Sequence, residues 1–582
     1  MSQLLSQLEA HGVLEPLDVE LSRALTRIAG ETRDDVLLAV ALTSRQLRDG
    51  HVCNELSRLA GQPLQDEQGN PSSIVCPQLG PWLTQLARSP LVGRDGSAGQ
   101  PLVLDDAGRL YLARYFDHEQ QVAQHILRMA RAQDTTAPVD TERVNRLFPP
   151  AGDTPDLQRD AAVASCARKL SIIVGGPGTG KTSTVVKLLT LLVEDAQARA
   201  QPTPKIVLVA PTGKAAQRLS ESIGRARDKL PISDETRRAI PANALTIHRA
   251  LRTTGGSTMR FVHGPQNPLA CDVLLLDEAS MVDLALMRRL LDAVPPHARV
   301  IMLGDPDQLA AVEAGGVLFD LCKAAEQPGS PLADCVSMLR QSYRYASESG
   351  IARLANAVHA QDADEALRLL RAGLPDVAFA SVPSQGAKNP LLQHASKRYA
   401  GLRSATLDER LATLDGYRVL CSHRRGPAGV EQLNPLLARA VQGSQRGSSE
   451  HYAGRPLLIL QNDYTSALYN GDVGVLHQAQ RRTPLCAYFR SETGAIRELS
   501  LARLPQHESV YAMTVHKSQG SEFDEVSIVL PDSGSALLSR ELLFTAITRA
   551  KTSVGIYASE ATLRSAIARA AQRSSGLGAR LA

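Results

Sequence analysis

Short apolar runs recur along the chain, and each is followed by a polar loop and then by a stretch whose apolar residues have helical spacing. Three such runs occupy positions 171–174, 273–276 and 300–303. Runs of this length without alternation are typical of parallel strands buried on both faces. The repeated order of strand, loop and helix predicts an α/β fold, with one parallel-sheet core over about 145–345.

A second core of the same type is predicted in two pieces, over 346–425 and 508–575. Between them, residues 455–505 alternate short apolar strands with turns, and Asn470-Gly471 is typical of a hairpin turn. The sequence therefore predicts a small β unit inserted into the second core.

Other segments lack this alternation. Residues 1–115 show helical periodicity, as in 34–42, and hold no catalytic pattern, so we expect a helical domain that docks onto partners. Residues 222–268 are polar and broken by glycines and a proline, which predicts an insertion on the surface of the first core. The Gly- and Ser-rich segment 443–449 is expected to be a linker.

Composition narrows the function classes. With 43% hydrophobic residues among 582, the chain is expected to be soluble and globular, with about four domains. A net charge of +4 is too small to indicate nucleic acid by itself, so any DNA path must be a local groove. Eight scattered cysteines without a C-x-x-C pair argue against a zinc site or a disulfide framework and favour a reducing cytoplasm. The sequence has neither a leader nor a run of about 18 apolar residues, so no membrane contact is expected.

The strongest chemical signal follows the first apolar run. A glycine-rich loop ending in Lys-Thr joins that run to a helix-like stretch, and this arrangement directs backbone N–H groups and a helix N-terminus at phosphate. Lys181 is expected to reach the β- and γ-phosphates of ATP, and the Thr182 hydroxyl to bind Mg²⁺. A chance glycine-rich turn is the alternative, although both flanks argue against it. The predicted ATP-binding residues of the loop are Gly175, Gly176, Pro177, Gly178, Thr179, Gly180, Lys181 and Thr182.

Polar side chains end the other two runs. Asp277 is expected to bind Mg²⁺, and Glu278 to orient and deprotonate the attacking water. Capping of the following helix is the alternative role for these two acids. After the third run, Gln308 is predicted to sense the γ-phosphate. A glutamine at a strand end is more often a plain surface amide, but its order after the other motifs favours the sensor.

Taken together, these and later motifs resemble those of superfamily-one DNA helicases, and within that group those of the RecD family, the alpha subunits of bacterial exonuclease V (RecBCD). They occur in family order over positions 158–551, about two thirds of the chain. Two shorter likenesses lie at 16–18 and 50–53. Beyond the phosphate loop, the motifs are APTGKAA (210–216), TIHR (246–249), DEAS (277–280), GDPDQ (304–308), QSYR (341–344), NGDVG (470–474), MTVHKSQGSEFD (513–524) and TAITRA (545–550).

The resemblance implies two RecA-like motor cores, an SH3-like barrel as the inserted unit, and ATP-driven movement from 5′ to 3′ along DNA. It also implies a heterotrimer with RecB-like and RecC-like subunits that binds single-stranded and duplex-end DNA. Such complexes act in double-strand-break repair by homologous recombination and in degradation of linear DNA. The sequence shows no carboxylate-plus-lysine nuclease cluster, so nuclease activity is expected on a partner.

Three more nucleotide-site residues follow from the resemblance. Arg549, from the second core, is expected to bind the γ-phosphate as an arginine finger, with Arg344 beside the hinge as its companion. A surface salt bridge is the alternative for either arginine. Gln158 resembles the glutamine that reads the adenine edge in such helicases, and an exposed glutamine at a helix start is its alternative.

DNA contacts are predicted from the same motifs. Single-stranded DNA is expected to cross both cores opposite the ATP site, bound mainly through its phosphates, since aromatic residues make up only 4% of the chain. Satisfied structural histidines are the alternative for the two histidines in this set. The predicted DNA-binding residues are Thr212, Lys214, His248, Thr514 and His516.

Two other function classes remain open on the sequence alone. A P-loop switch or clamp-loader-like ATPase would share the phosphate loop and Asp277-Glu278 but would not need residues 513–524 or a second core. A scaffold with an inactive ATPase fold is disfavoured, because the catalytic residue types are all present.

Overall fold

The computed structural model describes the 582-residue chain apart from short segments. The segment predicted to be a linker, 443–449, and the candidate companion Arg344 both lie outside the described residues. The residues not described are 1–2, 67–68, 97–98, 133–138, 151–154, 254–259, 342, 344–348, 382–388, 405, 427, 443–449, 464, 467, 481–482, 491–493, 533–537 and 572.

The first core is a six-stranded sheet in which every pair of neighbouring strands is parallel. Its central strands are mainly apolar and almost entirely buried, as the apolar runs predicted: β10 is formed by Val and Leu alone, while β7 also contains Ser171 and β11 also contains Met302. Strands β7, β11 and β10 are neighbours, so the loops at their C-terminal ends meet at one edge of the sheet. In sheet order, the strands are β12 (Val336–Leu339), β7 (Leu170–Gly175), β11 (Arg299–Gly304), β10 (Val273–Leu276), β8 (Ile206–Ala210) and β9 (Leu245–Thr246).

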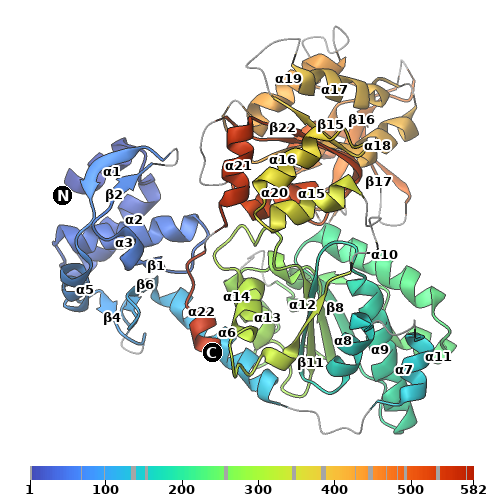
Figure 1. The fold of residues 1–582 in the computed structure, drawn as a ribbon, viewed down its shortest axis with the longest axis horizontal. Helices are drawn as coiled ribbons and strands as arrows, with labels where there is room; N and C mark the ends of the chain where they lie inside the picture. Colours follow the sequence, from blue (N-terminus) through green and yellow to red (C-terminus); the bar gives the residue numbers. More distant parts are fainter. Residues whose placement is uncertain are drawn as a thin grey trace.

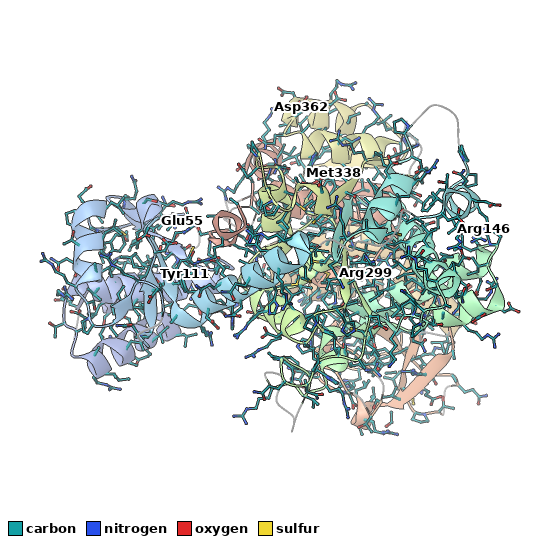
Figure 2. All side chains as sticks on the ribbon, turned by 90° about the horizontal axis from the view of Figure 1, so that it is seen from below. Glu55, Tyr111, Arg146, Arg299, Met338 and Asp362 are labelled. Atoms are coloured by element: carbon teal, nitrogen blue, oxygen red, sulfur yellow. The ribbon has the colours of Figure 1, made fainter. Side chains whose placement is uncertain are left out.

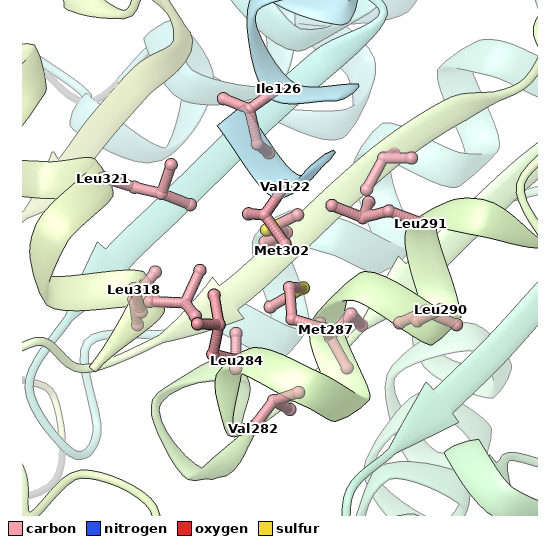
Figure 3. Close-up of a cluster of buried hydrophobic side chains, with 14 of the residues drawn as sticks. Val122, Ile126, Val282, Leu284, Met287, Leu290, Leu291, Met302, Leu318 and Leu321 are labelled. Atoms are coloured by element: carbon pink, nitrogen blue, oxygen red, sulfur yellow. The ribbon is translucent and has the colours of Figure 1, made fainter. Parts of the chain in front are cut away.

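Helices cover both faces of this sheet. On one face, Figure 3 shows Val122 and Ile126 of α6 packed with Met287 and Leu291 of α13 over Met302 of β11. The other face is covered by helices that contribute to a separate apolar cluster. The helices of this region are α6 (Ala113–Arg131), α7 (Thr141–Leu147), α8 (Leu157–Cys166), α9 (Lys181–Ala198), α10 (Gly213–Lys229), α11 (Asp234–Ala239), α12 (Ile247–Leu251), α13 (Leu284–Asp292) and α14 (Val317–Ala325), with 3₁₀ turns at Ala279–Met281 and Ala333–Cys335.

The surface insertion expected at 222–268 is not what the structure shows. This span contains the C-terminal half of α10, the helices α11 and α12, and the edge strand β9, whose Leu245 pairs with Val209 of β8. Ile247 and Leu251 of α12 belong to the main apolar cluster. A two-residue strand leaves no apolar run in the sequence, so polarity alone gave the wrong interpretation.

The second core is a five-stranded sheet, again with parallel neighbours throughout. It is assembled from two separate stretches of chain, as predicted from the apolar runs. Its strands are β13 (Val377–Ala380), β22 (Ala550–Tyr557), β21 (Phe523–Val529), β14 (Tyr417–Cys421) and β20 (Ala512–Thr514). Its helices are α15 (Gly350–His359), α16 (Ala363–Arg371), α17 (Pro390–Arg398), α18 (Leu407–Gly416), α19 (Val430–Gln442), α20 (Arg540–Ile547) and α21 (Glu560–Ala568), with 3₁₀ turns at Ala400–Arg403 and His516–Ser518.

An antiparallel sheet interrupts this second core. Asn470 and Gly471 form the centre of a turn that is closed by the bond from the Asp472 N–H to the Tyr469 carbonyl (3.0 Å), and Gly471 has a φ of +96°. A turn is thus present at Asn470-Gly471 and leads into β16, but it is not the hairpin turn that the sequence predicted, because residues 460–472 together connect the antiparallel strands β15 and β16. In sheet order, the strands are β18 (Ile496–Ser500), β17 (Cys486–Arg490), β16 (Val473–His477), β15 (Pro456–Ile459) and β19 (His507–Ser509), with a 3₁₀ turn at Leu501–Arg503.

The N-terminal region is not purely helical, which corrects the expectation for 1–115. Figure 2 shows it to one side of the two cores, with Glu55 and Tyr111 among its side chains. Strands of two to five residues are too short to leave a periodic signal. The helices are α1 (Gln3–Ala10), α2 (Pro16–Ala29), α3 (Asp34–Arg48), α4 (Leu56–Leu59) and α5 (Leu79–Ala87), and the strands are β1 (Asn54–Glu55), β2 (Pro63–Gln65), β3 (Pro71–Val75), β4 (Val92–Gly93), β5 (Leu102–Leu104) and β6 (Arg109–Leu112).

The C-terminal end of the chain leaves the second core and returns to the first. Figure 1 shows this red segment running from α21 to α22 (Leu577–Leu581), which lies beside α6 and α14. Leu577 and Leu581 are fully buried in the main apolar cluster of the first core. No helix within the described ranges is long and apolar enough to cross a membrane.

Candidate active site

The phosphate loop curls between β7 and α9, at the C-terminal edge of the first sheet. Gly178 and Gly180 have φ of +79° and +82°, a left-handed conformation that glycine adopts without strain. The Lys181 ammonium donates hydrogen bonds to the carbonyls of Gly175 (2.5 Å) and Gly176 (3.0 Å). The lysine side chain therefore folds over the loop whose backbone amides are expected to bind phosphate.

Gln158 lies against this loop. Asp156 caps α8 by accepting hydrogen bonds from the backbone N–H groups of Gln158 (3.0 Å) and Arg159 (3.1 Å). The Gln158 Nε2 then donates to the Thr179 carbonyl (3.1 Å). A Cβ atom on Gly180 would lie 2.3 Å from this Nε2, so the contact requires glycine at that position. The residue predicted to read adenine thus borders the phosphate site.

The two carboxylates lie at the end of β10, as the sequence predicted. Burial and the adjacent Glu278 carboxylate raise the pKa of Asp277, while the charges of Lys181 and Arg218 oppose this shift. A cation bound beside Asp277 would favour its ionised form. Asp277 and the hydroxyl of Thr182, in the first turn of α9, supply the oxygen ligands that Mg²⁺ prefers. These residues fit a divalent cation.

Glu278 has an unusual backbone. Its φ of +51° and ψ of +43° are left-handed values that a glutamate rarely adopts. Its N–H donates to Asp277 Oδ1 (2.8 Å) and its carbonyl accepts from the Met281 N–H (3.0 Å), which hold the bend. Strained residues cluster at functional sites. Glu278 makes no side-chain capping hydrogen bond to the 3₁₀ turn that follows it, and its water-activating role stays a prediction.

A chain of three side chains joins the two cores beside the phosphate loop. Gln308 Nε2 donates to Asp305 Oδ2 (2.9 Å), and Arg549 Nη2 donates to Gln308 Oε1 (3.0 Å). Arg549 also donates to the carbonyls of Thr545 and Ser521, both at 3.2 Å. Arg549 is 3% exposed and Gln308 is 9% exposed. The surface amide and surface salt bridge interpretations are therefore wrong for these two residues.

Further contacts across the cleft come from residues that the sequence analysis did not select. The Leu309 N–H donates to Thr545 Oγ1 (2.8 Å), and Gln519 Nε2 donates to the Leu309 carbonyl (2.6 Å). Arg218 of α10 pairs with Glu522 at 2.6 Å, within the motif at 513–524. The only sequence signal for Arg218 was its place four residues after Lys214, on one face of a helix.

Asp305 is a second buried acid near the phosphate loop. Burial raises its pKa to about 6, while the Lys181 charge and the hydrogen bond from Gln308 oppose the shift. Tyr343 reaches the same loop from the other side, because its N–H donates to the Gly178 carbonyl (2.8 Å) and its side chain is 63% exposed. Both residues border the nucleotide site, and neither was selected from the sequence.

The predicted DNA-binding residues lie on both cores. Thr212 caps α10 by accepting from the Ala215 N–H (3.2 Å), and Thr514 accepts from the Lys517 N–H (3.3 Å). A hydroxyl that accepts one bond keeps its own hydrogen to donate. Burial, followed by the nearby charges of arginines, lowers the pKa of Lys214 to about 8.

The surroundings of the two histidines favour their neutral forms. Burial lowers the pKa of His248, and burial together with the charge of Arg573 lowers the pKa of His516 to about 4. The His248 ring also lies 5.8 Å from the ring of Phe261. A neutral imidazole can donate one hydrogen bond to a phosphate but cannot form an ion pair with it.

A small hollow opens where the inserted sheet meets the first core. Tyr469, from the loop before β16, approaches α10 so closely that a Cβ on Gly213 would lie 3.2 Å from its Cβ. Arg249 and Gln217, which the sequence analysis did not select, bring a charge and an amide to this hollow. It is lined by Gly213, Ala216, Gln217, Ser220, Ala244, Thr246, Arg249 and Tyr469.

Three family models match the chain in the same order as these structural units. A model described as the N-terminal domain of RecBCD enzyme subunit RecD matches residues 10–111. An AAA domain model matches 158–314, and a UvrD-like helicase C-terminal domain model matches 509–557.

Sequence comparison with whole proteins shows the family more clearly than the three domain models do. RecBCD enzyme subunit RecD of Mycolicibacterium smegmatis is 42% identical over 584 residues, covering 99% of this chain and 99% of the relative. The chain belongs to the RecD family. The ATP-dependent RecD2 DNA helicase of Deinococcus radiodurans is 30% identical over 472 residues, covering 79% of this chain and 57% of that helicase. A crystal structure of Bacteroides Pif1 bound to single-stranded DNA is 17% identical, with a TM-score of 0.38, and covers 70% of this chain and 93% of Pif1.

Membership in the RecD family decides between the function classes that the sequence left open. This RecD-family chain is a superfamily-one helicase, so the clamp-loader-like switch and the inactive scaffold are excluded. Both parallel-sheet cores contribute to the site, which a single-core switch does not require.

Proposed function

We propose that this chain is the ATP-dependent 5′-to-3′ DNA helicase subunit of a RecBCD-type helicase–nuclease. In this proposal, it works with RecB-like and RecC-like subunits in the cytoplasm, in homologous repair of double-strand breaks and in degradation of linear DNA. The observation that carries the proposal is the Arg549–Gln308 contact, because it joins the second core to the phosphate loop side of the first.

Each residue of the site has one step in the proposed mechanism. Asp277 and the Thr182 hydroxyl would hold Mg²⁺, which would supply positive charge to neutralise the phosphates of ATP. Lys181 stabilises charge that develops on the transferring phosphoryl group, and Glu278 orients and deprotonates the attacking water. Gln308 and Arg549 contact the γ-phosphate late in closure, so that hydrolysis depends on how the two cores approach each other.

The DNA path in this proposal uses polar groups on both cores. Thr212, Lys214, His248, Thr514 and His516 bind phosphates, with the histidines as neutral donors. A phosphate next to Lys214 would favour the charged form of this lysine, and so would oppose burial and the nearby arginine charges, which lower its pKa. We further propose that the antiparallel sheet β15–β19 is the SH3-like barrel of this helicase group, with Tyr469 facing the path.

Polarity gives the proposal its direct test. The full-length chain is expected to unwind a duplex with a 5′ single-stranded tail at least about tenfold faster than one with a 3′ tail, because a motor loads on the strand along which it moves. Strand separation is followed by fluorescence, and the Lys181→Ala variant serves as the control without a motor. Faster unwinding of the 3′-tailed duplex would overturn the proposed direction.

Partner docking is proposed to use an apolar stripe on α2. Leu17 and Ile28 are 69% and 80% exposed, and with the partly exposed Leu21 and Ala24 they follow the i, i+4, i+7, i+11 spacing of one helix face. Such a face favours burial against another protein. A RecC-like or RecB-like subunit is its proposed occupant.

Two substitutions on this stripe test the docking. Leu17→Ser combined with Ile28→Ser is expected to weaken binding of the RecB-like and RecC-like subunits by about tenfold or more, since each buried apolar side chain contributes about 1.5–3 kcal/mol. Binding is measured by co-purification and titration, with Arg27→Ser, on another face of α2, as the matched control. Unchanged binding of the double variant would place the docking surface elsewhere.

A further inference from the structure

The crossing from the second core to the first is short and tightly held at both ends. On the second core, the carbonyl of Arg569 accepts from the Arg540 N–H (2.8 Å), and the Ala571 N–H donates to Glu541 Oε2 (2.6 Å). Both partners are at the start of α20. From Arg573 onward, the hydrogen bonds of the described residues to other parts of the chain are with the first core and the N-terminal region. The chain thus passes between the two bodies within two residues.

Arg573 is the first residue after the crossing, and its guanidinium binds a cluster of backbone carbonyls. It donates to the carbonyls of Glu313 (2.9 Å), Gly315 (3.3 Å) and Ala311. These three carbonyls belong to the loop 305–316, between β11 and α14, which also carries Gln308. Five donors in a fixed planar fork suit an arginine to several carbonyls at once. Arg573 therefore fixes the shape of the loop that carries Gln308.

The same guanidinium reaches the N-terminal region. It donates to the Gly50 carbonyl (3.4 Å), which also accepts from the Gly315 N–H (3.1 Å). Gly50 has a φ of +88°, and a Cβ there would lie 3.1 Å from Arg573 Cζ. The next residues reinforce this contact, because the Ser574 N–H donates to His51 Nδ1 (2.8 Å). The N-terminal region and the loop at 311–315 are therefore held by one side chain.

Behind Arg573, a fully buried acid anchors the returning chain. Glu119 of α6 is 0% exposed and accepts from the Gly576 N–H (2.7 Å) and the Ser575 hydroxyl (2.8 Å). The Arg580 guanidinium also donates to Glu119, at 3.2 Å. A buried charge that accepts several hydrogen bonds is costly to displace. Glu119 therefore fixes the returning chain to α6 of the first core.

Helix α20 closes a ring of contacts with these elements. At its start, Glu541 binds the crossing segment. Near its end, Thr545 binds Leu309, and Arg549, two residues after the helix, binds Gln308. Because a helix is rigid, a shift of the loop relative to α20 must change the contacts at both ends.

We propose that Arg573 is a positioning residue for ATP hydrolysis, which rests on the proposed function of Gln308 and Arg549. It holds residues 311–315 so that Gln308 meets Arg549 when the cores close. Through Gly50, it also transmits the position of the N-terminal region to this loop. Partner docking on the N-terminal region is thereby linked to the rate of hydrolysis.

Steady-state kinetics of the full-length chain test the positioning role. Arg573→Ala is expected to lower kcat of DNA-stimulated ATP hydrolysis by about tenfold while KM for ATP changes by less than about twofold, because nucleotide-binding residues are untouched. Arg573→Lys is expected to restore only part of the rate, since lysine lacks the fork. In the Gln308→Ala background, Arg573→Ala is expected to have no further effect. Arg564→Ala, an exposed arginine on α21, is the control.

A glycine substitution tests the contact between Arg573 and Gly50 of the N-terminal region. Gly50→Ala is expected to displace the guanidinium and to lower kcat as Arg573→Ala does. Gly12→Ala is its matched control, because Gly12 has a similar φ of +70° but nothing within 4 Å of an added Cβ. Equal kinetics of the two glycine variants would show that the contact between Arg573 and Gly50 has no effect on ATP hydrolysis.

Amide hydrogen exchange measures the local stability of the loop 305–316 and does not depend on ATPase activity. Residues 305–316 are expected to exchange at least about fivefold faster in Arg573→Ala than in wild type or Arg564→Ala, because the loop loses three carbonyl contacts. Unchanged exchange at 305–316, a rise in KM that matches the fall in kcat, or full additivity with Gln308→Ala would overturn the positioning role. A wild-type chain without DNA-stimulated ATPase would instead contradict the proposed function.

Discussion

Replacing Lys181 by alanine is expected to reduce ATP turnover by about a thousandfold, because the ammonium is the charged donor nearest the transferring phosphate and electrostatic stabilisation of that kind contributes several kcal/mol. The fold should survive, since the buried face of α9 is formed by other side chains, among them Val185 and Leu189. Steady-state ATPase with single-stranded DNA present measures the effect, and thermal unfolding checks the fold.

Lys205→Ala is the matched control for this prediction. Lys205 is an exposed lysine just before β8, at the opposite end of the same sheet. Its removal should leave turnover unchanged. If a well-folded Lys181→Ala variant hydrolysed ATP at near the wild-type rate, the assignment of the phosphate loop would be wrong.

The second large effect is expected at the contact between the cores. Gln308→Ala and Arg549→Ala should each retain ATP binding but lose most hydrolysis and unwinding, and a lost arginine finger alone lowers kcat by about 10³-fold or more. The two side chains are 3.0 Å apart, so the double variant should be little worse than Arg549→Ala alone. Nucleotide affinity from equilibrium titration and kcat from turnover separate the two effects.

Arg549 is buried, so its alanine variant could fail to fold. Arg549→Lys keeps the charge but loses the planar fork, and it should fold and still turn over slowly. Thermal unfolding of all three variants identifies any that are unstable. Equal losses of nucleotide affinity and of rate would assign Gln308 and Arg549 to simple binding.

The site could be predicted where chemistry follows directly on a strand. Asp277 comes immediately after four buried apolar residues, so its place at the edge of the sheet required only the strand prediction. Lys181 and its loop are equally local. Arg549 and Gln308 are 241 residues apart, so the sequence predicted a role at the γ-phosphate for each of them but not the contact between the two side chains.

The misses share a physical cause. Strand β9 has two residues and owes its place to pairing with β8, so residues 222–268 showed no apolar run and were interpreted as a surface insertion. The short strands of the N-terminal region failed to appear for the same reason. The return of the C-terminal segment depends on Glu119, which binds Gly576 at a separation of 457 residues, and no window of sequence contains that contact.

The account as a whole depends on ATP hydrolysis that is driven by DNA. The most direct measurement is the ATPase rate of the full-length chain with and without single-stranded DNA, with Lys181→Ala as the background. We expect DNA to raise the wild-type ATPase rate about tenfold. The reason is that binding of a DNA strand across both cores brings Arg549 and Gln308 to the nucleotide. Equal rates with and without DNA, at saturating ATP, would contradict the account.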